Sequence, residues 1–474
     1  MSGFLNQVWT IARHSVVQAI RMRLVAVLVV FLLVLVPALP FLLQGDKTHA
    51  GQLRIVLTYT IYLISFILSI LTLFLSAITL NTEIRNQHIF LLDPKPVSRG
   101  TLLLGKWVGV MIIIIVLLVA MLGMTYGIVQ FLGRQMPFES APEYKAFRAE
   151  VMSARRGATP ERPNLNDWVD QEYKYAKSKN LLPAEWSEGW AKMKIRQRLE
   201  KGAWRVAPGE TVKWEIKLDS PVSPDDVILV RFRHHGDGGA YDHVLQGNFV
   251  INESGQPVVR YPDPVRRIGP RGFQVGVPNN FMVTGKVVRP DGTLEVRYTN
   301  TDEDGVSALF PFDDGMQILY PSSGIGTNFV LMGGLMFCKL TLIAIVGIFA
   351  STFLSFPVAV FFSIVVFVTG HLASFIFTDL LKDVYIFGTS MVPPWMPLRA
   401  GDELIRNAMA WFFSIFPNFA QYDLVPVMTD GVLIPPMVVV DCFIWFVVLR
   451  GGILAVLAWY IFRRRELAAL TPTT

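Results

Sequence analysis

Six apolar stretches, each long enough to cross a bilayer as a helix, constrain the fold of this chain most strongly. A helix that crosses roughly 30 Å of hydrocarbon needs about 20 predominantly apolar residues. The stretches that meet this requirement are Leu24–Leu43, Ile55–Leu80, Val108–Leu132, Phe329–Leu354, Pro357–Thr378 and Met437–Phe462. The first follows three arginines, as a signal peptide would, but its apolar core is too long for one and we expect it to be retained. The predicted fold class is an α-helical polytopic membrane protein with six transmembrane helices.

A single large polar insert, residues 134–327, separates the first three stretches from the last three. Its first part, 138–201, is rich in Ala, Glu, Lys and Trp and predicts helices. From 204 to 320, short alternating runs separated by Gly, Pro, Asn and Asp predict a β-sandwich-like part. The runs are Val212–Leu218, Val227–Arg233, Gly247–Ile251, Gly285–Val288 and Leu294–Thr299. The predicted domains are therefore 1–133, 134–327 (an α+β insert) and 328–474.

The distribution of charge predicts the orientation in the membrane. The formal net charge is +6, but the basic residues flank apolar spans or lie in the mixed-sign insert, which favours an inner-leaflet surface over nucleic acid. Lys and Arg in short loops stay on the cytoplasmic side. With six spans, the arginine-rich amino-terminal stretch, segment 81–107 and Arg463–Arg465 share one side. We expect cytoplasmic termini, an extracytoplasmic insert and a location in the bacterial cytoplasmic membrane.

Two further segments are amphipathic. Apolar residues recur at helical spacing near the amino terminus, which predicts a helix along the inner membrane interface. They are Leu5, Val8, Trp9, Ala12, Val16 and Ile20. Residues 399–416, within the proline-bounded external segment 393–417, predict a second helix, which is short enough to enter the outer leaflet without crossing it.

The segment between the second and third spans carries the strongest functional pattern. It reads Glu83-Ile-Arg-Asn-Gln-His-Ile-Phe-Leu-Leu-Asp-Pro-Lys-Pro-Val-Ser-Arg-Gly-Thr-Leu-Leu-Leu-Gly-Lys106. It resembles the cytoplasmic loop of ABC-2 type transporter permeases, where a helix after the second span leads into a KPVSR…LLGK pattern. Two other fragments, Phe416-Pro-Asn-Phe-Ala-Gln-Tyr-Asp-Leu424 and Phe462-Arg-Arg-Arg-Glu-Leu467, are similar to sequences that precede and end the family's last span. The resemblance covers everything except the insert.

The resemblance implies a subunit that works as a homodimer or heterodimer with a separate ATP-hydrolysing subunit. Within coupling segment 82–107, residues 82–99 would form the coupling helix. Ile89, Phe90, Leu91 and Leu92 would fill a groove on the ATPase, and Glu83, Arg85 and Arg99 would orient the helix. Lys95 is a further predicted coupling residue. ATP and magnesium would bind to the partner, and no cofactor is expected in this chain. The alternative is a solvated basic loop that only enforces topology.

One stretch of this segment has the spacing of a phosphate-binding loop, Gly100-Thr-Leu-Leu-Leu-Gly-Lys106. Trp107 stands where Ser or Thr would bind magnesium, the interior is leucine, and no strand precedes it. The stretch therefore predicts the start of the third span, and no nucleotide site is expected.

No metal site is predicted in the insert. Asn300-Thr-Asp-Glu-Asp-Gly305 matches the first half of a calcium loop, but Pro311 replaces the bidentate Glu, and a hairpin turn between strands is favoured. His234, His235, Asp237, Asp242 and His243 surround a glycine-rich turn, yet adjacent histidines on a strand point to opposite sides. Polar loop residues are the favoured interpretation. Trp168, Trp186, Trp190 and Trp204 are expected to pack in the core, although a sugar-binding platform is an alternative.

Ionisable residues within the spans are the remaining functional candidates. They are Lys339, His371, Asp441 and Arg450. Such groups are costly in hydrocarbon and should face protein, water or an interface. They could line a path for an anionic or amphiphilic cargo, or pair across the dimer.

The sequence is best explained as the membrane subunit of an ABC-2 type exporter. A membrane-anchored binding or sensing protein, in which the β-rich insert recognises a ligand, is the main alternative. An ion-coupled secondary transporter is disfavoured because the chain shows neither an internal repeat nor matched broken spans.

Overall fold

The computed structural model describes residues 2–43, 48–85, 98–135, 141–162, 165–178, 187–200, 202–237, 244–251, 271–375 and 397–464. The chain divides into two compact units. The helical unit comprises Met1–Met136, Gly326–Thr429 and Ile434–Thr474. The insert unit comprises Pro137–Ile325 together with the short segment Asp430–Leu433.

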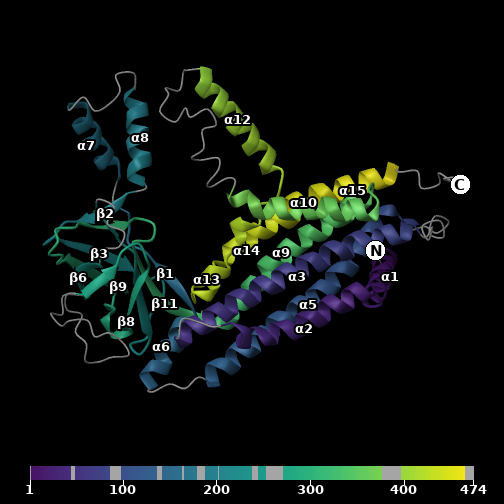
Figure 1. Ribbon diagram of the computed structural model, residues 1–474, viewed down its shortest axis with the longest axis horizontal. Coiled ribbons are helices and arrows are strands. Elements are labelled where there is room, and N and C mark those ends of the chain that lie inside the picture. The colour runs from purple at the N-terminus through teal and green to yellow at the C-terminus, as the bar shows by residue number, and fades with distance from the viewer. Residues whose placement is uncertain are drawn as a thin grey trace. The chain divides into compact units, whose positions relative to one another are not determined.

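Six candidate membrane helices are found among the described residues, which confirms the six-span prediction. The first five are α2 (Arg23–Leu42), α3 (His49–Arg85), α5 (Arg99–Gln135), α9 (Ile325–Ser351) and α10 (Phe356–Phe375). The sixth is continuous through α14 (Pro436–Cys442), the π-helical η6 (Phe443–Gly451) and α15 (Gly452–Arg464). Most of these helices run lengthwise beside one another (Figure 1). Their apolar composition explains why they form: only an internally hydrogen-bonded backbone is tolerated in hydrocarbon.

Helices α3 and α5 are much longer than a bilayer requires. Each contains 37 residues, or roughly 55 Å at 1.5 Å per residue, against about 30 Å of hydrocarbon. The extra length of α5 lies mainly at its amino end, before the apolar stretch that starts at Val108. The chain between these two helices therefore starts and ends on helices that continue past the apolar stretches.

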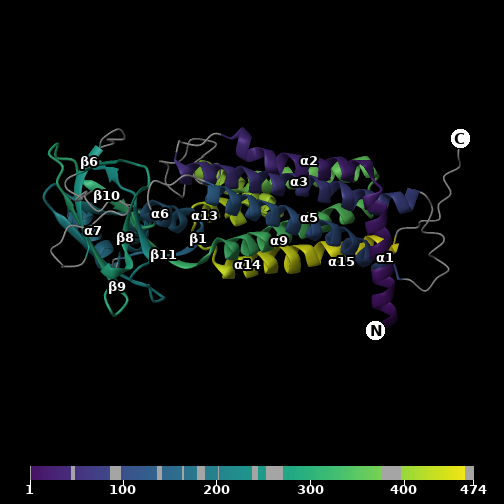
Figure 2. The same cartoon turned by 90° about the horizontal axis from the view of Figure 1, so that it is seen from below.

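Helix α1 (Ser2–Ile20) lies crosswise to the long helices (Figure 2). Its predicted apolar stripe is divided between two surroundings. Val8 and Ala12 are buried, together with the small residues Ser15 and Ala19, whereas Leu5, Trp9 and Ile20 are at least 60% exposed. One face of α1 thus packs on protein, and the neighbouring apolar face is available to lipid, as the interfacial prediction requires.

The contact between α1 and α5 depends on glycine. A Cβ added at Gly109 would lie 2.7 Å from Ser15 Cβ and 2.8 Å from the carbonyl oxygen of Ala12. A Cβ added at Gly105 would lie 2.7 Å from Ile11 Cβ. Because such distances are shorter than any ordinary contact, the two backbones can approach this closely only where α5 has no side chain.

Short helical elements precede the last span. They are α12 (Pro397–Ser414), η5 (Ala420–Tyr422) and α13 (Val425–Thr429). Helix α12 falls within the amphipathic segment predicted from the prolines. Whether it enters the outer leaflet stays a prediction.

The insert unit contains three antiparallel sheets, with strand orders β1-β11-β4-β8, β2-β10-β5 and β3-β9-β6-β7. The strands are β1 (Ser153–Ala158), β2 (Ala203–Val206), β3 (Thr211–Lys217), β4 (Val227–Phe232), β5 (His235–Gly236), β6 (Val244–Ile251), β7 (Arg271–Gln274), β8 (Asn279–Thr284), β9 (Thr293–Asn300), β10 (Ala308–Pro311) and β11 (Met316–Gly324). The helices are α6 (Ala141–Val151), α7 (Leu165–Ser178) and α8 (Glu188–Glu200). Inward-facing residues of all three sheets form one hydrophobic core, which includes Trp214, Phe232, Phe249 and Tyr298.

Three local predictions for the insert are wrong. Strand β1 interrupts the segment 138–201 that was expected to be helical, because it pairs with β11. Gly285–Val287 is a 3-10 helix (η2) where a strand was predicted; a Cβ at Gly285 would lie 2.0 Å from the carbonyl oxygen of Ser223. Asn300–Gly305 is not a hairpin turn, since β9 and β10 belong to different sheets.

A buried arginine attaches Asp430–Leu433 to the rest of the insert unit. Arg155 on β1 is 1% exposed. Its Nη2 donates to the carbonyl oxygens of Glu150 and Asp430, both at 2.8 Å. Its backbone N–H donates to Gly431, and its carbonyl accepts from the N–H of Leu433. Backbone carbonyls thus satisfy a guanidinium that would otherwise be costly to bury.

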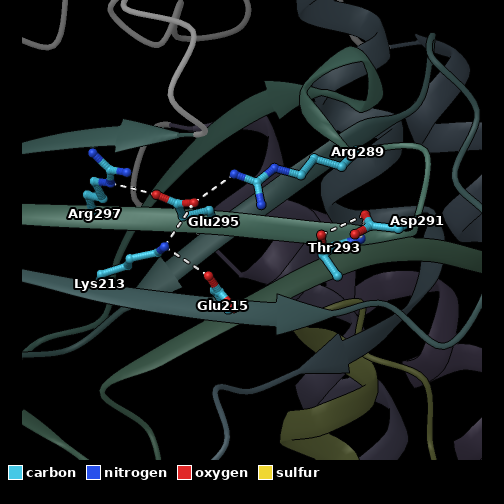
Figure 3. Close-up of polar contacts among 7 residues, drawn as sticks. All are labelled: Lys213, Glu215, Arg289, Asp291, Thr293, Glu295 and Arg297. Carbon is cyan, nitrogen blue, oxygen red and sulfur yellow. Dashed lines mark hydrogen bonds and ion pairs between the residues drawn. The ribbon is translucent and has the colours of Figure 1, made fainter.

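A charged cluster covers the outer face of the β3-β9 pair (Figure 3). Glu295 on β9 is only 2% exposed, although its neighbours Leu294 and Val296 point into the core. Its carboxylate accepts from Arg297 at 2.5 Å and Arg289 at 2.7 Å and pairs with Lys213 at 3.3 Å. Burial opposes ionisation, but these three cations hold the pKa of Glu295 below its usual range.

Candidate coupling site and intramembrane cavity

Helix α5 begins at a side-chain cap supplied by the coupling segment. Ser98 Oγ accepts the backbone N–H of Thr101 at 3.1 Å and lies 2.7 Å from Thr101 Oγ1. A serine at this position satisfies one of the free N–H groups at a helix start. The Ser-Arg-Gly-Thr sequence therefore fixes where the third span begins.

Arg99 joins the coupling segment to the end of the last span. Its Nη1 donates to the carbonyl oxygen of Phe462 at 2.7 Å and to that of Arg463 at 3.2 Å. Carbonyls in the last turn of a helix have no partner within the helix, so a cation is favourable there. The guanidinium also lies 5.8 Å from the centre of the Phe462 ring. Two separate fragments of the family resemblance thus meet in space.

A buried ion pair joins α3 to α5. Lys106 Nζ donates to the carboxylate of Glu83, and the Lys106 side chain is fully buried. Glu83 was predicted to orient the coupling helix, and this role stays a prediction. The residue is only 6% exposed, and its partner in the structure is Lys106 of the same chain. A buried pair of this kind is costly to break because the remaining charge is left without a partner.

Four helices, α3, α5, α9 and α15, contribute to a hydrophobic cluster that includes Phe462, whose carbonyl accepts from Arg99. The hydrophobic cluster consists of Leu80, Leu102, Leu103, Ile348, Ala458 and Phe462, with Ile11, Trp107 and Phe349 against it. A Cβ at Gly100 would lie 3.1 Å from the Trp459 ring, so glycine allows α15 to approach. We call this arrangement of the ion pair, Arg99 and the cluster the coupling base.

Of the other predicted coupling residues, the structure describes only Arg85. Arg85 is the last residue of α3. Ile89, Phe90, Leu91, Leu92 and Lys95 lie outside the described residues. Lys106 was not predicted as the partner of Glu83, although both are ionisable residues on the helices that flank the coupling segment. Residues 100–106 form the first turns of α5, as predicted, and not a phosphate-binding loop.

A second site is a cavity of about 540 Å³ within the helical unit. Apolar side chains of α3, α9 and α10 line most of it. Lys339 and His371, both predicted from the sequence, are brought together there, with Lys339 Nζ 3.1 Å from His371 Nε2 and 3.1 Å from Ser65 Oγ. The rings of Phe367 and Phe419 each lie 5.7 Å from Nζ.

The remaining two intramembrane candidates are separate from this pair. Asp441 accepts a hydrogen bond from Tyr422 at 2.6 Å, and the ring of Tyr422 lines the cavity. Arg450 donates to the carbonyl oxygen of Ser414 at 3.1 Å and does not line the cavity. Two polar residues of the cavity wall, Tyr62 and Asp423, were not predicted as site residues; the Tyr62 hydroxyl donates to Asp423 at 2.9 Å.

The histidine cluster of the insert does not converge on a metal within the described residues. His234 is 1% exposed, with ring centres 5.8 Å from Phe232 and 5.7 Å from Phe310. Burial lowers the pKa of His234 to about 4, so this side chain is neutral at neutral pH. His235 lies on β5, and Asp242 and His243 lie outside the described residues.

The half calcium loop is used for internal hydrogen bonds. Asn300 Nδ2 donates to the carbonyl oxygens of Val206 and Val306, both at 2.9 Å. Asp302 Oδ2 accepts the N–H of Val306 at 3.1 Å. The polar residues thus stabilise the crossing from one sheet to another. Of the four tryptophans named above, Trp204 packs on Trp214 and Phe312, whereas Trp168 is 40% exposed.

Residues 9–147 match the family model described as ABC-2 family transporter protein. The match includes most of α1, the first three candidate spans and the coupling base residues Glu83, Arg99 and Lys106. It confirms the resemblance for this part of the chain, whereas the fragments 416–424 and 462–467 lie outside the matched residues. No curated protein matches the chain.

Proposed function

We propose, on the premise that residues 9–147 match the ABC-2 family transporter proteins, that this chain is the permease subunit of an ABC exporter. ATP would be hydrolysed, with magnesium, by a separate ATPase subunit that binds the coupling segment. A second permease subunit, identical or related, would complete the transporter. The cytoplasmic membrane would hold it, with the coupling segment inside and the insert outside.

The coupling base is the observation that carries this proposal. Glu83–Lys106 joins the end of α3 to the start of α5, and Arg99 joins α5 to the last carbonyls of α15. A displacement of residues 86–97 by the ATPase would therefore move α3, α5 and α15 together, because the helices at both ends of that segment contribute to one packed cluster. Rigid-body displacement of helices is an established way to transmit a change between subunits.

Co-purification of the tagged chain with an ATPase subunit that carries a phosphate-binding loop tests the proposal. Phe90→Asp with Leu91→Asp places two charges on the apolar part of the coupling segment and should abolish both retention of the ATPase and stimulation of its hydrolysis. Val244→Asp is the matched control, since Val244 is 52% exposed on the insert and should tolerate an acid. Undiminished retention and stimulation in the double variant would refute the proposal.

A further inference from the structure

Lys339 lies near the middle of a candidate membrane helix. It is the fifteenth of the 27 residues of α9, with about 18 Å of helix between it and the nearer end. An ammonium at that depth must be satisfied inside the protein or by a ligand, because hydrocarbon does not solvate it. The cavity described above is the space that it faces.

The hydrogen bonds of His371 determine its tautomer, and the tautomer determines whether the ring can accept a hydrogen bond from Lys339. His371 Nδ1 lies 2.9 Å from the carbonyl oxygen of Phe367, which can only accept, so Nδ1 carries the proton. In the neutral ring Nε2 is then an acceptor, and it takes one N–H of Lys339 at 3.1 Å. Ser65 Oγ takes a second at 3.1 Å. The third N–H has no acceptor among the described residues, and the rings of Phe367 and Phe419 flank the ammonium.

The acids near the cavity are engaged by tyrosines. Tyr62 donates to Asp423 at 2.9 Å, and Tyr422 donates to Asp441 at 2.6 Å. No carboxylate of the described ranges forms an ion pair with Lys339. Lys339 therefore has no carboxylate at ion-pair distance among the described residues, although the Tyr62–Asp423 pair lies on the same cavity wall. Most of the other lining side chains are apolar.

We propose that this cavity binds an amphiphile with an anionic headgroup, a phosphate or a carboxylate. An anionic oxygen would accept the third N–H of Lys339, and the apolar chain would lie against Phe66, Leu335 and Leu372 on the cavity wall. Its volume of about 540 Å³ falls within the roughly 300–1,000 Å³ of small-molecule sites. That this ligand is the transported substrate rests on the proposed function, whereas its binding to the cavity does not.

Binding of radiolabelled dodecyl phosphate to the full chain in phosphatidylcholine nanodiscs tests this. Dodecyl maltoside and dodecyltrimethylammonium carry the same alkyl chain on neutral and cationic headgroups and should compete poorly. Lys339→Met should weaken dodecyl phosphate binding about 10- to 100-fold, the value of a hydrogen bond to a charged group. Lys339→Arg should retain most of the affinity. Arg450→Met, which removes a span cation outside the cavity, should leave affinity unchanged.

Phosphatidylglycerol in the nanodisc distinguishes the source of the headgroup. Displacement of dodecyl phosphate supports a bilayer lipid as the occupant, and persistence supports a single-chain amphiphile. Should Lys339→Met fail to fold, Leu372→Trp keeps the charge and should block binding by filling the cavity. Equal affinity in wild type and a folded Lys339→Met, or no preference for dodecyl phosphate over dodecyl maltoside, would overturn the proposal. Because no ATPase is present, this result is independent of the co-purification test.

Discussion

Single residues decide whether the coupling base holds together, and the Glu83–Lys106 pair shows how. Both groups are removed from solvent, so each charge depends on the other. The pair need not add net stability over two apolar residues, but either member alone is a buried charge without a partner. Its role is to fix which part of α3 meets which part of α5.

Glu83→Gln and Lys106→Met should each destabilise the chain by about 3–5 kcal/mol, and the double variant should lose much less. The reason is that the double variant leaves no unpaired charge. Thermal unfolding of the purified chain, followed by size-exclusion chromatography after heating, measures the difference. Additive losses in the double variant would show that the two side chains do not interact.

Protonation of His234 should make the insert less stable in acid. Its pKa is about 4 in the folded chain and about 6.5 when unfolded, so below pH 6.5 the unfolded state binds more protons. The contribution of neutral His234 to the free energy of unfolding is therefore fully present above pH 6.5. It falls by about 1.4 kcal/mol per pH unit as the pH drops toward 4.

Hydrogen exchange of β4 in the full chain, compared with His234→Phe at the same pH, measures this effect. The variant should lose the part of the acid sensitivity that arises between pH 6.5 and 4, because Phe cannot be protonated. Lys286→Met, at an exposed basic site of the insert, is a control that should keep it. Identical pH dependence in wild type and His234→Phe would contradict the assignment.

At the scale of elements, the crossing of α1 over α5 depends on the absence of side chains at Gly105 and Gly109. Gly109→Ala should cost about 1–3 kcal/mol, because the added methyl meets the backbone of α1 and neither helix can move freely. Gly123 on the same helix has nothing within 4 Å of an added Cβ. Gly123→Ala should be neutral or stabilise by up to about 1 kcal/mol through helix propensity.

Thermal unfolding of the two glycine variants in the same detergent compares them directly. A Gly109→Ala chain as stable as Gly123→Ala would show that α1 does not pack on α5 as described. Exposure of α1 in the Gly109 variant can be followed by limited proteolysis near Arg13 and Arg21.

The elements that could be predicted from sequence are those that depend on local composition. Runs of 20 apolar residues predict spans by themselves, and the alternation of apolar and polar residues predicted β3 and β9. Strand β1 could not be found, because Ser-Ala-Arg-Arg-Gly-Ala is not strand-like and pairs with a partner more than 150 residues away. Lys339 and His371 were likewise predicted only as separate residues, because their contact depends on how α9 packs on α10.

For the whole molecule, the orientation across the membrane is predicted only from the distribution of Lys and Arg in the short loops. Cys338 and Cys442 are both buried, so an introduced cysteine can be labelled above a low background. A membrane-impermeant maleimide applied to intact spheroplasts should label Asp225→Cys in the insert and not Asn6→Cys in α1. Both positions are exposed in the folded chain, so permeabilised spheroplasts should be labelled at both. Labelling of Asn6→Cys alone from outside would reverse the topology.

Arg155 and its bonds to Asp430–Leu433 have a practical consequence for engineering. The insert unit is formed by two separate segments of the chain, and the shorter segment, Asp430–Leu433, lies just before the last span. Excising 137–325 would remove the strand on which these four residues pack. Gly431 would keep a backbone suited to φ +68°, but no guanidinium would donate hydrogen bonds to the carbonyl oxygens of Asp430 and Gly431. A chimaera that borrows a foreign insert will assemble properly only if it imports its own version of that tetrapeptide too.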